Sequence, residues 1–324
     1  MLSVVIPVLN EASSLETLWQ ELAAVARDRG YELEVIFVDD GSTDASWSVI
    51  ERLAAADERV RGIRFRRNFG KAAALAAGFR AVRGDLVMTL DADLQDDPRE
   101  IPNFLAALEL NLDVVSGWKR VRHDPWHKVG PSRVFNWMVS WLTGVPLHDH
   151  NCGMKCYRRE VLAEVKLYGE LHRFVPVLAH ARGFRVGELA IQHRPRRFGQ
   201  SKYGVSRFIK GFLDLMTVKF LIGFGRRPQH LLGSIGLACL LVGGAALAYL
   251  ALYWVACVAS GNDPKLHERP ALFYSVGILI LGGQFLSIGL LGELVTAYVG
   301  REEDTYSIAA LTAPRVSHTE EHAP

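Results

Sequence analysis

Residues 86–95 read LVMTLDADLQ, an apolar run that ends in two acids. The run at 86–90 predicts a buried strand, and Asp91 and Asp93 follow its C-terminal end. In an open α/β sheet, ligands bind in the crevice beyond that end of the strands. Oxygen ligands at this spacing suit a magnesium- or manganese-type ion that bridges a phosphate. A solvated turn with acids at a helix start is the alternative, and the short motif alone does not exclude it.

Strand and helix patterns alternate on both sides of this motif. Further strands are predicted over residues 2–6, 33–38, 60–65 and 114–116, and helices over 13–29, 44–56, 71–82 and 99–110. Such alternation predicts an α/β fold with a mostly parallel sheet that is covered on both faces. Ser13 and Glu16 form a capping-box pattern, and Asp44 and Asp97 stand where caps of the following helices are expected.

Acids also follow the first two predicted strands. Residues 7–11 read PVLNE, and residues 38–44 read VDDGSTD. Since the tips of parallel strands lie side by side, acids from three strands are expected in one crevice, where a cation or hydrogen-bond donors would offset their repulsion. Asp39 or Asp40 is a candidate acceptor for a ribose or a base. No glycine-rich phosphate loop occurs, so a metal is the expected substitute for holding phosphates.

Two long apolar tracts change the class of protein. Residues 231–258 contain no charge, and residues 271–299 contain only Gln284 and Glu293 as strongly polar side chains. About 20 apolar residues cross a bilayer core as a helix, so both tracts are long enough to span it. Arginines flank the outer ends of the pair, and the positive-inside rule then places the first domain in the cytosol. We therefore expect a multi-pass protein of the cytoplasmic (inner) membrane.

The segments before the first apolar tract have patterns of a membrane surface. Residues 206–224 mix three cations with apolar side chains, which predicts an amphipathic interfacial helix. Residues 134–142, with Trp137 and Trp141, predict either a core helix or a membrane-surface helix, and residues 123–128 look like a loop. The predicted organisation is a cytosolic domain at 1–205, an interfacial segment at 206–229, a transmembrane hairpin at 230–300 and a tail at 301–324.

Composition adds limits to the class of partner. The 324 residues carry a net charge of +2 and give no indication of nucleic-acid binding. No signal peptide pattern opens the sequence. Neither a disulfide framework nor a zinc ribbon is predicted from the four cysteines. His148, His150 and Cys152 are an alternative metal cluster, but they lack the paired spacings usual in zinc sites.

Together the motifs resemble family 2 glycosyltransferases with the GT-A fold, a Rossmann-like mostly parallel sheet. Within that family they resemble the polyprenyl-phosphate glycosyltransferases, which include dolichol-phosphate mannose synthase and bacterial undecaprenyl-phosphate sugar transferases. The resemblance covers nearly the whole chain to about Ser307. It is carried by the acid-rich segments above and by RNFGK at 67–71, DADLQDDP at 91–98, NCGMK at 151–155, RRFGQSKY at 196–203 and the C-terminal hairpin.

The resemblance implies roles for the matching residues. A nucleotide pocket would be lined by Pro7, Leu9, Glu11, Val38, Asp39, Asp40, Lys71, Ala92 and Lys119. The Mg²⁺ or Mn²⁺ would be held by Asp91, Asp93 and Gln95. Catalytic roles would fall to Asp93, Arg196, Lys202, Asp149 and Asn151, with the two cations meeting phosphate.

The implied reaction is inverting transfer of a sugar from a UDP- or GDP-linked donor to a polyprenyl phosphate, with undecaprenyl phosphate as the expected acceptor. The resemblance leaves open which sugar and base are used and whether the chain forms a homo-oligomer. A transferase acting on another lipid or polysaccharide acceptor is the first alternative. A processive synthase lacks its Gln-x-x-Arg-Trp signature here, a nucleotidyltransferase lacks its basic glycine-rich loop, and a membrane scaffold without activity would leave the acids unexplained.

Overall fold

The computed structural model describes residues 1–120, 126–165, 171–194, 206–223, 228–262 and 265–299. Its centre is a seven-stranded sheet in the order β3-β2-β1-β4-β6-β5-β7. The strands are β1 (Leu2–Val8), β2 (Leu33–Asp39), β3 (Val60–Arg64), β4 (Leu86–Thr89), β5 (Val114–Lys119), β6 (Lys155–Arg158) and β7 (Val186–Ile191). All neighbouring pairs are parallel except the two that involve β6. The predicted mostly parallel sheet is confirmed.

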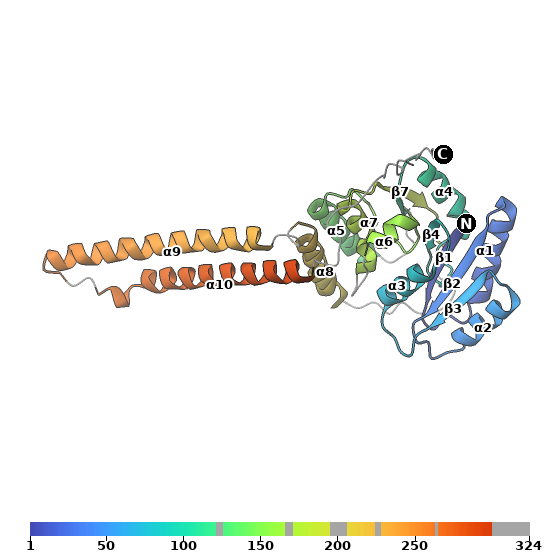
Figure 1. Cartoon of the computed structure of the whole chain (residues 1–324), viewed down its shortest axis with the longest axis horizontal. Helices are drawn as coiled ribbons and strands as arrows, with labels where there is room; N and C mark the ends of the chain where they lie inside the picture. Colours follow the sequence, from blue (N-terminus) through green and yellow to red (C-terminus); the bar gives the residue numbers. More distant parts are fainter. Residues whose placement is uncertain (121–125, 166–170, 195–205, 224–227, 263–264, 300–324) are drawn as a thin grey trace, which may run out of the picture.

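Helices cover both faces of the sheet (Figure 1). One face packs against α1 (Leu15–Arg29), α2 (Ser46–Ala56) and α4 (Ile101–Glu109), and a short 3₁₀ turn at Pro98–Glu100 leads into α4. The other face packs against α3 (Lys71–Ala81), α6 (Arg159–Glu164) and α7 (Val175–Ala181). Beside them lie α5 (Trp126–Thr143), a 3₁₀ turn at Leu171–Phe174 and α8 (Ser206–Gly223).

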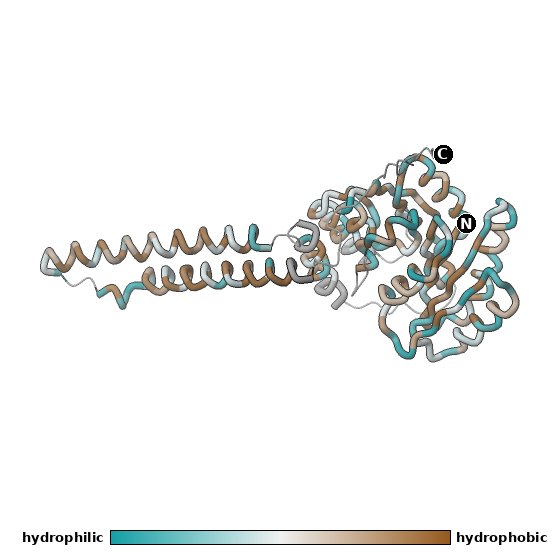
Figure 2. Tube along the Cα trace, viewed as in Figure 1, coloured by the Kyte–Doolittle hydropathy of each residue, from teal (hydrophilic) through white to brown (hydrophobic). Residues whose placement is uncertain are grey.

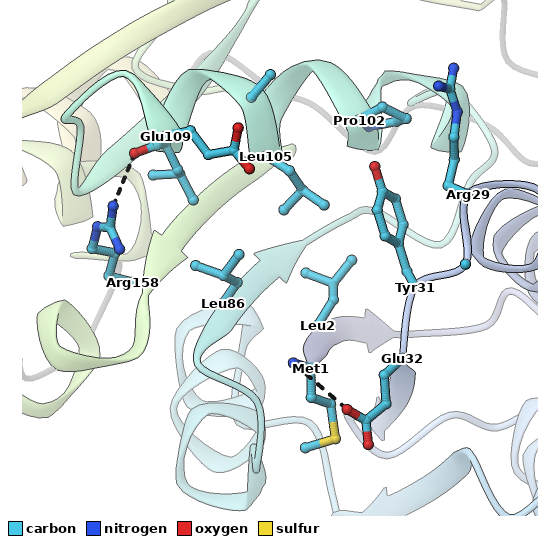
Figure 3. Close-up of a pocket in the computed structure, with 13 residues that line it drawn as sticks. Met1, Leu2, Arg29, Tyr31, Glu32, Leu86, Pro102, Leu105, Glu109 and Arg158 are labelled. Atoms are coloured by element: carbon cyan, nitrogen blue, oxygen red, sulfur yellow. Dashed lines mark hydrogen bonds and ion pairs between the residues drawn. The ribbon is translucent and has the colours of Figure 1, made fainter.

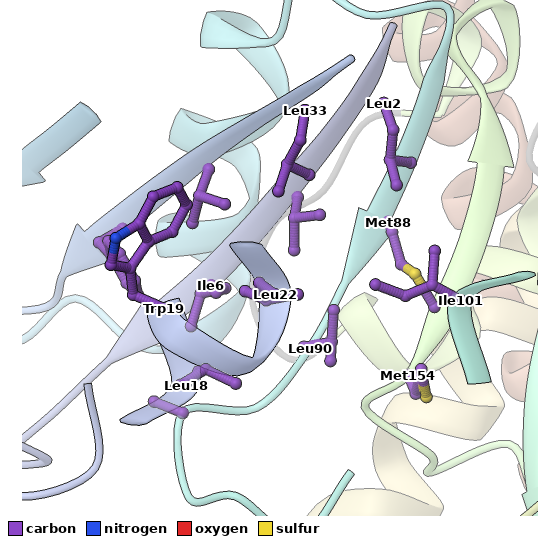
Figure 4. Close-up of a cluster of buried hydrophobic side chains, with 14 of the residues drawn as sticks. Leu2, Ile6, Leu18, Trp19, Leu22, Leu33, Met88, Leu90, Ile101 and Met154 are labelled. Atoms are coloured by element: carbon purple, nitrogen blue, oxygen red, sulfur yellow. The ribbon is translucent and has the colours of Figure 1, made fainter. Parts of the chain in front are cut away.

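The main hydrophobic core lies between the sheet and α1 (Figure 4). Alternate residues of β1 point into it, and Ile6 is fully buried against Leu18 and Leu22 of the helix. Met88 and Leu90 extend the core to the strand that precedes the acids. Because side chains alternate across a strand, this packing fixes the register in which Asp91 leaves the sheet.

Three predictions of local structure need correction. The first helix begins at Leu15 with Ser14 at its N-cap, and the hydroxyl of Ser14 donates to Glu11 O at 2.8 Å, so no Ser13–Glu16 capping box forms. The segment expected to be a loop at 123–128 is helical from Trp126. The antiparallel strand β6 and the edge strand β7 were not predicted, because four and six residues of mixed polarity show no clear alternation.

Two long helices leave the sheet domain side by side (Figure 1). They are α9 (Pro228–Ala259) and α10 (Pro270–Val299), with a 3₁₀ turn at Leu266–Glu268 between them. Both are long and apolar enough to cross a membrane, and only 17% and 11% of their most apolar windows are buried, so they are not core helices of the domain (Figure 2). The segments predicted to span the membrane are therefore exposed apolar helices.

A large cavity of about 540 Å³ opens at the amino ends of the strands (Figure 3). Leu2, Tyr31, Leu86 and Leu105 line it, between α4 and the start of the sheet. Residues predicted for the functional site do not appear among its described lining residues. The functional site must therefore be sought at the opposite, carboxyl edge.

Candidate active site

The acids of three strands meet at the carboxyl edge of the sheet. The strands β2, β1 and β4 are direct neighbours. Beyond the strands, Asp40 N donates to Val8 O at 2.9 Å and Leu90 N donates to Val5 O at 3.3 Å. The three tips are thus joined side by side, and the predicted convergence of acids at one edge is present.

At the tip of β2, two aspartates hold neighbouring loops through hydrogen bonds to backbone N–H groups. Asp39 is fully buried, and its Oδ1 accepts Ser42 N at 2.9 Å. Asp40 accepts Phe69 N at 2.7 Å and Gly70 N at 3.0 Å, which fastens the loop before α3 to this tip. Burial raises the pKa of Asp40 although these N–H groups act against the rise. Gly41 has φ +73°, and a Cβ there would lie 2.5 Å from Arg67 C, so only glycine allows this close approach.

At the tip of β1, Asn10 connects the first two loops. Its φ is +58°, a left-handed conformation that asparagine tolerates better than most residues. Asn10 Oδ1 accepts Thr43 N at 2.8 Å, and Asn10 N donates to Ser42 Oγ at 3.0 Å. The sequence analysis predicted no role for Asn10. An asparagine at the end of a strand could have indicated one, because its side chain often hydrogen-bonds to loop backbone.

The remaining residues predicted to line the nucleotide pocket differ in their exposure at this edge of the sheet. Leu9 is 36% exposed at the tip, and Pro7 and Glu11 are partly buried. Val38 is fully buried in the core on the α3 side of the sheet, and Ala92 is 4% exposed in the main core. Their roles toward a nucleotide stay predictions.

After β4, the chain makes a tight turn that presents Asp91 and Asp93. Leu94 has φ +60° and is 1% exposed, an unusual conformation for a leucine that tertiary packing must hold in place. Asp93 Oδ1 accepts Gln95 N at 3.2 Å, which bends the chain back on itself. Gln95 Nε2 lies 3.4 Å from His193 Nε2. The turn thus carries Asp91, Asp93 and Gln95 within five residues of the strand end, and their role as ligands of one metal stays a prediction.

The two acids that follow have structural partners. Asp96 is fully buried and pairs with Lys119 Nζ at 3.0 Å. Burial by itself would lower the pKa of Lys119, but Asp96 and Asp91 outweigh it and raise that pKa, so the ammonium stays charged. Asp97 accepts Arg99 N at 3.0 Å and pairs with Arg194 at 2.6 Å. The prediction that Asp97 is a cap is confirmed, and Lys119 is placed at the carboxyl edge beside the acids.

Lysines next to Asp91 lower the pKa of its carboxyl group. Lys71, the first residue of α3, forms a short ion pair with Asp91 Oδ1. Burial alone would raise the pKa of Asp91, but Lys71 and Lys119 outweigh it and hold that pKa at about 2. Asp91 is thus an anion at any physiological pH, as a metal ligand or a partner for a cationic group requires.

The loop before β6 packs directly against the carboxylate of Asp91. A Cβ on Gly153 would lie 2.5 Å from Asp91 Oδ2, so the loop backbone lies directly against the carboxylate. Thr89 Oγ1 donates to Gly153 O at 2.7 Å and fixes the loop to β4. Asp149 is 1% exposed, and its Oδ1 accepts Asn151 N at 3.1 Å. Asp149 and Asn151 therefore lie in the same loop as Gly153, the residue that contacts Asp91.

A small enclosed space, which we call the Asp91 cavity, adjoins this carboxylate. Its volume is about 80 Å³. The polar side chains in its wall are Lys71, Thr89, Asp91, Asn151, Cys152, Lys155, Tyr157, His172 and Arg173. Burial and the three neighbouring cations hold the pKa of His172 at about 2, so this imidazole is neutral. Sequence reasoning missed Lys155, His172 and Arg173 as cavity residues, because the elements that carry them were not predicted.

Comparison with known proteins shows the family of this chain. Residues 3–166 match the family described as Glycosyl transferase family 2. The chain belongs to glycosyltransferase family 2. A dodecaprenyl-phosphate galacturonate synthase of Rhizobium johnstonii is 38% identical over 309 residues, which cover 93% of this chain and 89% of that protein. An undecaprenyl-phosphate 4-deoxy-4-formamido-L-arabinose transferase of Pseudomonas fluorescens is 36% identical, with 92% and 84% covered.

Solved structures place this family 2 member among GT-A-like folds. Glucosyl-3-phosphoglycerate synthase from Mycobacterium tuberculosis, in complex with Mn²⁺, uridine diphosphate and phosphoglyceric acid, superposes with a TM-score of 0.54. The match covers 68% of this chain and 78% of that one at 18% identity. At that identity the likeness shows the fold alone. The GT-A architecture predicted from sequence is confirmed.

The donor set of this family 2 site fits a divalent cation that a substrate helps to hold. Two carboxylates and an amide oxygen come from one turn, and all are hard oxygen ligands. The described residues contain no group of three or more His, Cys, Asp or Glu side chains placed to hold a metal by themselves. Mg²⁺ commonly binds through one or two carboxylates together with substrate phosphates, and Asp91, Asp93 and Gln95 match that arrangement.

The histidines near this loop have other partners. His148 Nδ1 lies 2.7 Å from Glu188 Oε2, and its ring stacks on Trp118 at 4.2 Å. His150 is fully buried with Nε2 3.0 Å from Ser140 Oγ. Cys152 is buried, and burial raises the pKa of its thiol to about 12. Arg196 and Lys202, predicted to meet phosphate, lie outside the described residues.

Proposed function

We propose that this chain transfers a sugar from a nucleotide-sugar donor to a polyprenyl phosphate. The observation that carries the proposal is that one chain contains both the acid-lined edge of the sheet and the apolar hairpin. A dodecaprenyl-phosphate galacturonate synthase matches 93% of this chain, including the hairpin. A long isoprenoid stays in the bilayer, so the catalytic domain must be anchored where its acceptor lies.

Under this proposal, Asp91, Asp93 and Gln95 hold Mg²⁺ or Mn²⁺ against the donor diphosphate. The ion supplies charge neutralisation for the departing diphosphate. Lys71 keeps Asp91 ionised and oriented through the ion pair at Oδ1. Asp40 shapes the nucleoside side of the crevice by holding the N–H groups of Phe69 and Gly70.

The acceptor needs little activation by the protein. A phosphate monoester has a second pKa near 6, so the acceptor oxygen is already anionic at neutral pH. Its in-line attack on the anomeric carbon inverts that centre and expels the nucleoside diphosphate. The work of the side chains is then to position two anionic substrates and to balance their charge. We assign the balancing role to Lys119, Arg196 and Lys202, and place Asp149 and Asn151 on the acceptor side.

We propose that an exposed apolar surface on α5 and α8 rests on the cytosolic membrane face. Trp137 and Trp141 are 67% and 71% exposed and stack on each other, and Phe212, Leu213 and Met216 are exposed on α8. Lys219 Nζ donates to Leu142 O at 2.6 Å, which joins the two helices. Both helices lie at the end of the domain from which the hairpin leaves (Figure 1). Tryptophan is favoured at the membrane interface, where one part of the ring is apolar and another polar.

A donor screen tests the proposed function. Full-length protein in detergent is incubated with Mn²⁺, undecaprenyl phosphate and UDP- or GDP-linked sugars in turn, and lipid-linked product is measured. We expect product from a restricted set of donors, and a loss of at least 100-fold for Asp93→Asn, because removal of one charge-stabilising group typically costs that much. Product on a polysaccharide or another lipid, with none on the polyprenyl phosphate, would contradict the proposal.

A further inference from the structure

The ring of His148 is held in one orientation by two contacts. Its Nδ1 lies 2.7 Å from Glu188 Oε2, and its face stacks on Trp118 with the ring centroids 4.2 Å apart. The same carboxylate accepts the backbone N–H groups of His148 at 3.1 Å and of Asp149 at 2.9 Å. Glu188 therefore holds both the imidazole and the part of the loop that carries it.

The other ring nitrogen, Nε2, is available to a ligand. A carboxylate beside Nδ1 favours the form in which Nδ1 carries the hydrogen, and Nε2 is then the atom that gains or loses a proton. The His148 side chain is 65% exposed, and the residues that the structure describes provide no hydrogen-bond partner for Nε2. An imidazole oriented by a carboxylate in this way is a common arrangement in functional sites.

His148 lies at the same edge of the sheet as the acids. Trp118, on which it stacks, is the next-to-last residue of β5. The strands β4 and β5 run in the same direction, because both are antiparallel to β6. The carboxyl end of β5 is therefore at the edge where β4 presents Asp91. With β6 between them, the two strands are about 10 Å apart, which leaves room for one sugar ring between His148 and Asp91.

The loop that carries His148 is also joined to the proposed membrane surface. The preceding residue is fastened to α5, where Ser140 Oγ donates to Leu147 O at 2.8 Å. That helix carries the exposed Trp137 and Trp141, and it lies at the end of the domain where the hairpin begins (Figure 1). The phosphate of an isoprenoid in the bilayer would reach the acids from the side on which His148 lies.

A phosphate monoester suits this nitrogen because the two groups together bind one proton. A neutral Nε2 accepts the remaining O–H of the phosphate monoanion, and an imidazolium donates Nε2–H to the dianion. The second pKa of a phosphate monoester is near 6, and imidazole changes its charge between about pH 5 and 8, so one of these forms is present near neutral pH. The charged groups described around the ring are Glu188 on β7 and Asp149 in its own loop, whereas Lys119 at the end of β5 pairs with Asp96.

We infer that His148 Nε2 binds the phosphate of the polyprenyl acceptor and that Glu188 positions the ring for this contact. The inference rests on the proposed function and adds to it a residue that recognises the acceptor. The donor diphosphate is held at Asp91, on the other side of the transferred sugar. The two anionic substrates thus have separate partners.

The two Michaelis constants of His148→Gln test the inference. Full-length protein in detergent without phospholipid is assayed with Mn²⁺ and a donor that gives lipid-linked product. We expect the KM for undecaprenyl phosphate to rise about tenfold, because a hydrogen bond to a charged group is lost, while the KM for the donor stays within about twofold. The donor KM also shows that the variant is folded. His180→Gln, at an exposed position on α7, is the control and should leave both constants unchanged.

The pH dependence separates this contact from a structural role. Since the bound phosphate and His148 share one proton, the KM of the original chain for undecaprenyl phosphate should rise about tenfold or more between pH 7 and pH 9. The amide of His148→Gln donates at any pH, so its KM should change less than about threefold over the same range.

Three results would contradict the inference and leave the proposed function intact. They are an unchanged acceptor KM in His148→Gln, a rise confined to the donor KM, and a raised acceptor KM with the same pH dependence as the original chain. Absence of lipid-linked product from the original chain with every donor would overturn the proposed function and this inference with it.

Discussion

At the scale of single residues, Gly153 determines how closely the loop before β6 approaches Asp91. Because a Cβ would lie 2.5 Å from Asp91 Oδ2, Gly153→Ala must displace either the loop or the carboxylate. We expect the affinity for Mn²⁺, in the presence of saturating nucleoside diphosphate, to fall tenfold or more. The free ion can be measured by electron paramagnetic resonance, so the result does not depend on activity.

Gly130 on α5 supplies the matched control for this substitution. A Cβ there meets nothing within 4 Å, and alanine is a better helix former than glycine. Gly130→Ala should bind Mn²⁺ as the original chain does. Equal Mn²⁺ affinity in the two variants would show that Asp91 does not hold the ion or that the loop yields without moving it.

His150 makes the stability of the domain depend on pH. Burial, with a smaller effect from Lys155, lowers the pKa of this imidazole from 6.5 to about 4. Between those values the unfolded chain binds a proton that the folded chain does not, so stability is lost as pH falls from 6.5 toward 4, by about 1.4 kcal/mol per pH unit. The melting temperature in detergent should therefore fall across this range.

His150→Gln removes this contribution and should make the fall of the melting temperature less steep, while the buried His172, whose pKa is also lowered, keeps its own contribution. His180 lies exposed in the last turn of α7, and His180→Gln is the control that should leave the pH dependence unchanged. The same slope in the two variants would mean that His150 is not the group responsible.

At the scale of elements, glycines set the contact between α9 and α10. A Cβ on Gly243 would lie 2.9 Å from Leu279 N and from Ser275 O, whereas a Cβ on the next residue, Gly244, would meet nothing within 4 Å. Close backbone approach at small residues is a main source of helix association in membranes. Gly243→Ala should lower the melting temperature of the hairpin in detergent by several degrees.

Gly244→Ala is an adjacent control of the same chemistry. It should be neutral or slightly stabilising, because it adds helix propensity without a clash. The difference between the two variants can be followed by circular dichroism during heating. Equal melting temperatures would indicate that the helices separate more easily than their packing suggests.

How well the sequence predicts an element depends on how that element is buried. The strands β1, β2 and β4 are buried on both faces, and their continuous apolar runs predicted them correctly. The strand β7 is only partly buried, and β6 has four residues, so neither shows a period that reasoning from sequence can detect. Since β6 carries Lys155, the Asp91 cavity was not predictable, whereas the acids at the strand tips were. Which residues lie next to these acids depends on the order of the strands in the sheet, and apolar runs in the sequence do not reveal that order.

At the scale of the whole molecule, the apolar surface on α5 joins the catalytic domain to its proposed membrane. Trp137 and Trp141 project from a helix next to α8, at the end of the domain where the hairpin begins (Figure 1). Burial of apolar surface stabilises membrane binding by about 25 cal/mol per Å². Replacement of both tryptophans by serine removes apolar surface that would otherwise be buried in the membrane interface. We expect transfer to undecaprenyl phosphate in liposomes to fall about tenfold.

Transfer to a short, water-soluble polyprenyl phosphate should change less than twofold in the same double variant, because that acceptor does not require the bilayer. Leu110 is the control, because it is 80% exposed and directly follows α4, a helix that lies away from the hairpin (Figure 1). Leu110→Ser should leave transfer to both acceptors unchanged. If the double variant lost activity equally on the two acceptors, the tryptophans would be supporting the fold of α5 against the domain, and the membrane would have to be met by another surface. If only the liposome reaction fell, the orientation of the domain would follow, with the carboxyl edge of the sheet and its acids held close to the plane where the acceptor phosphate lies.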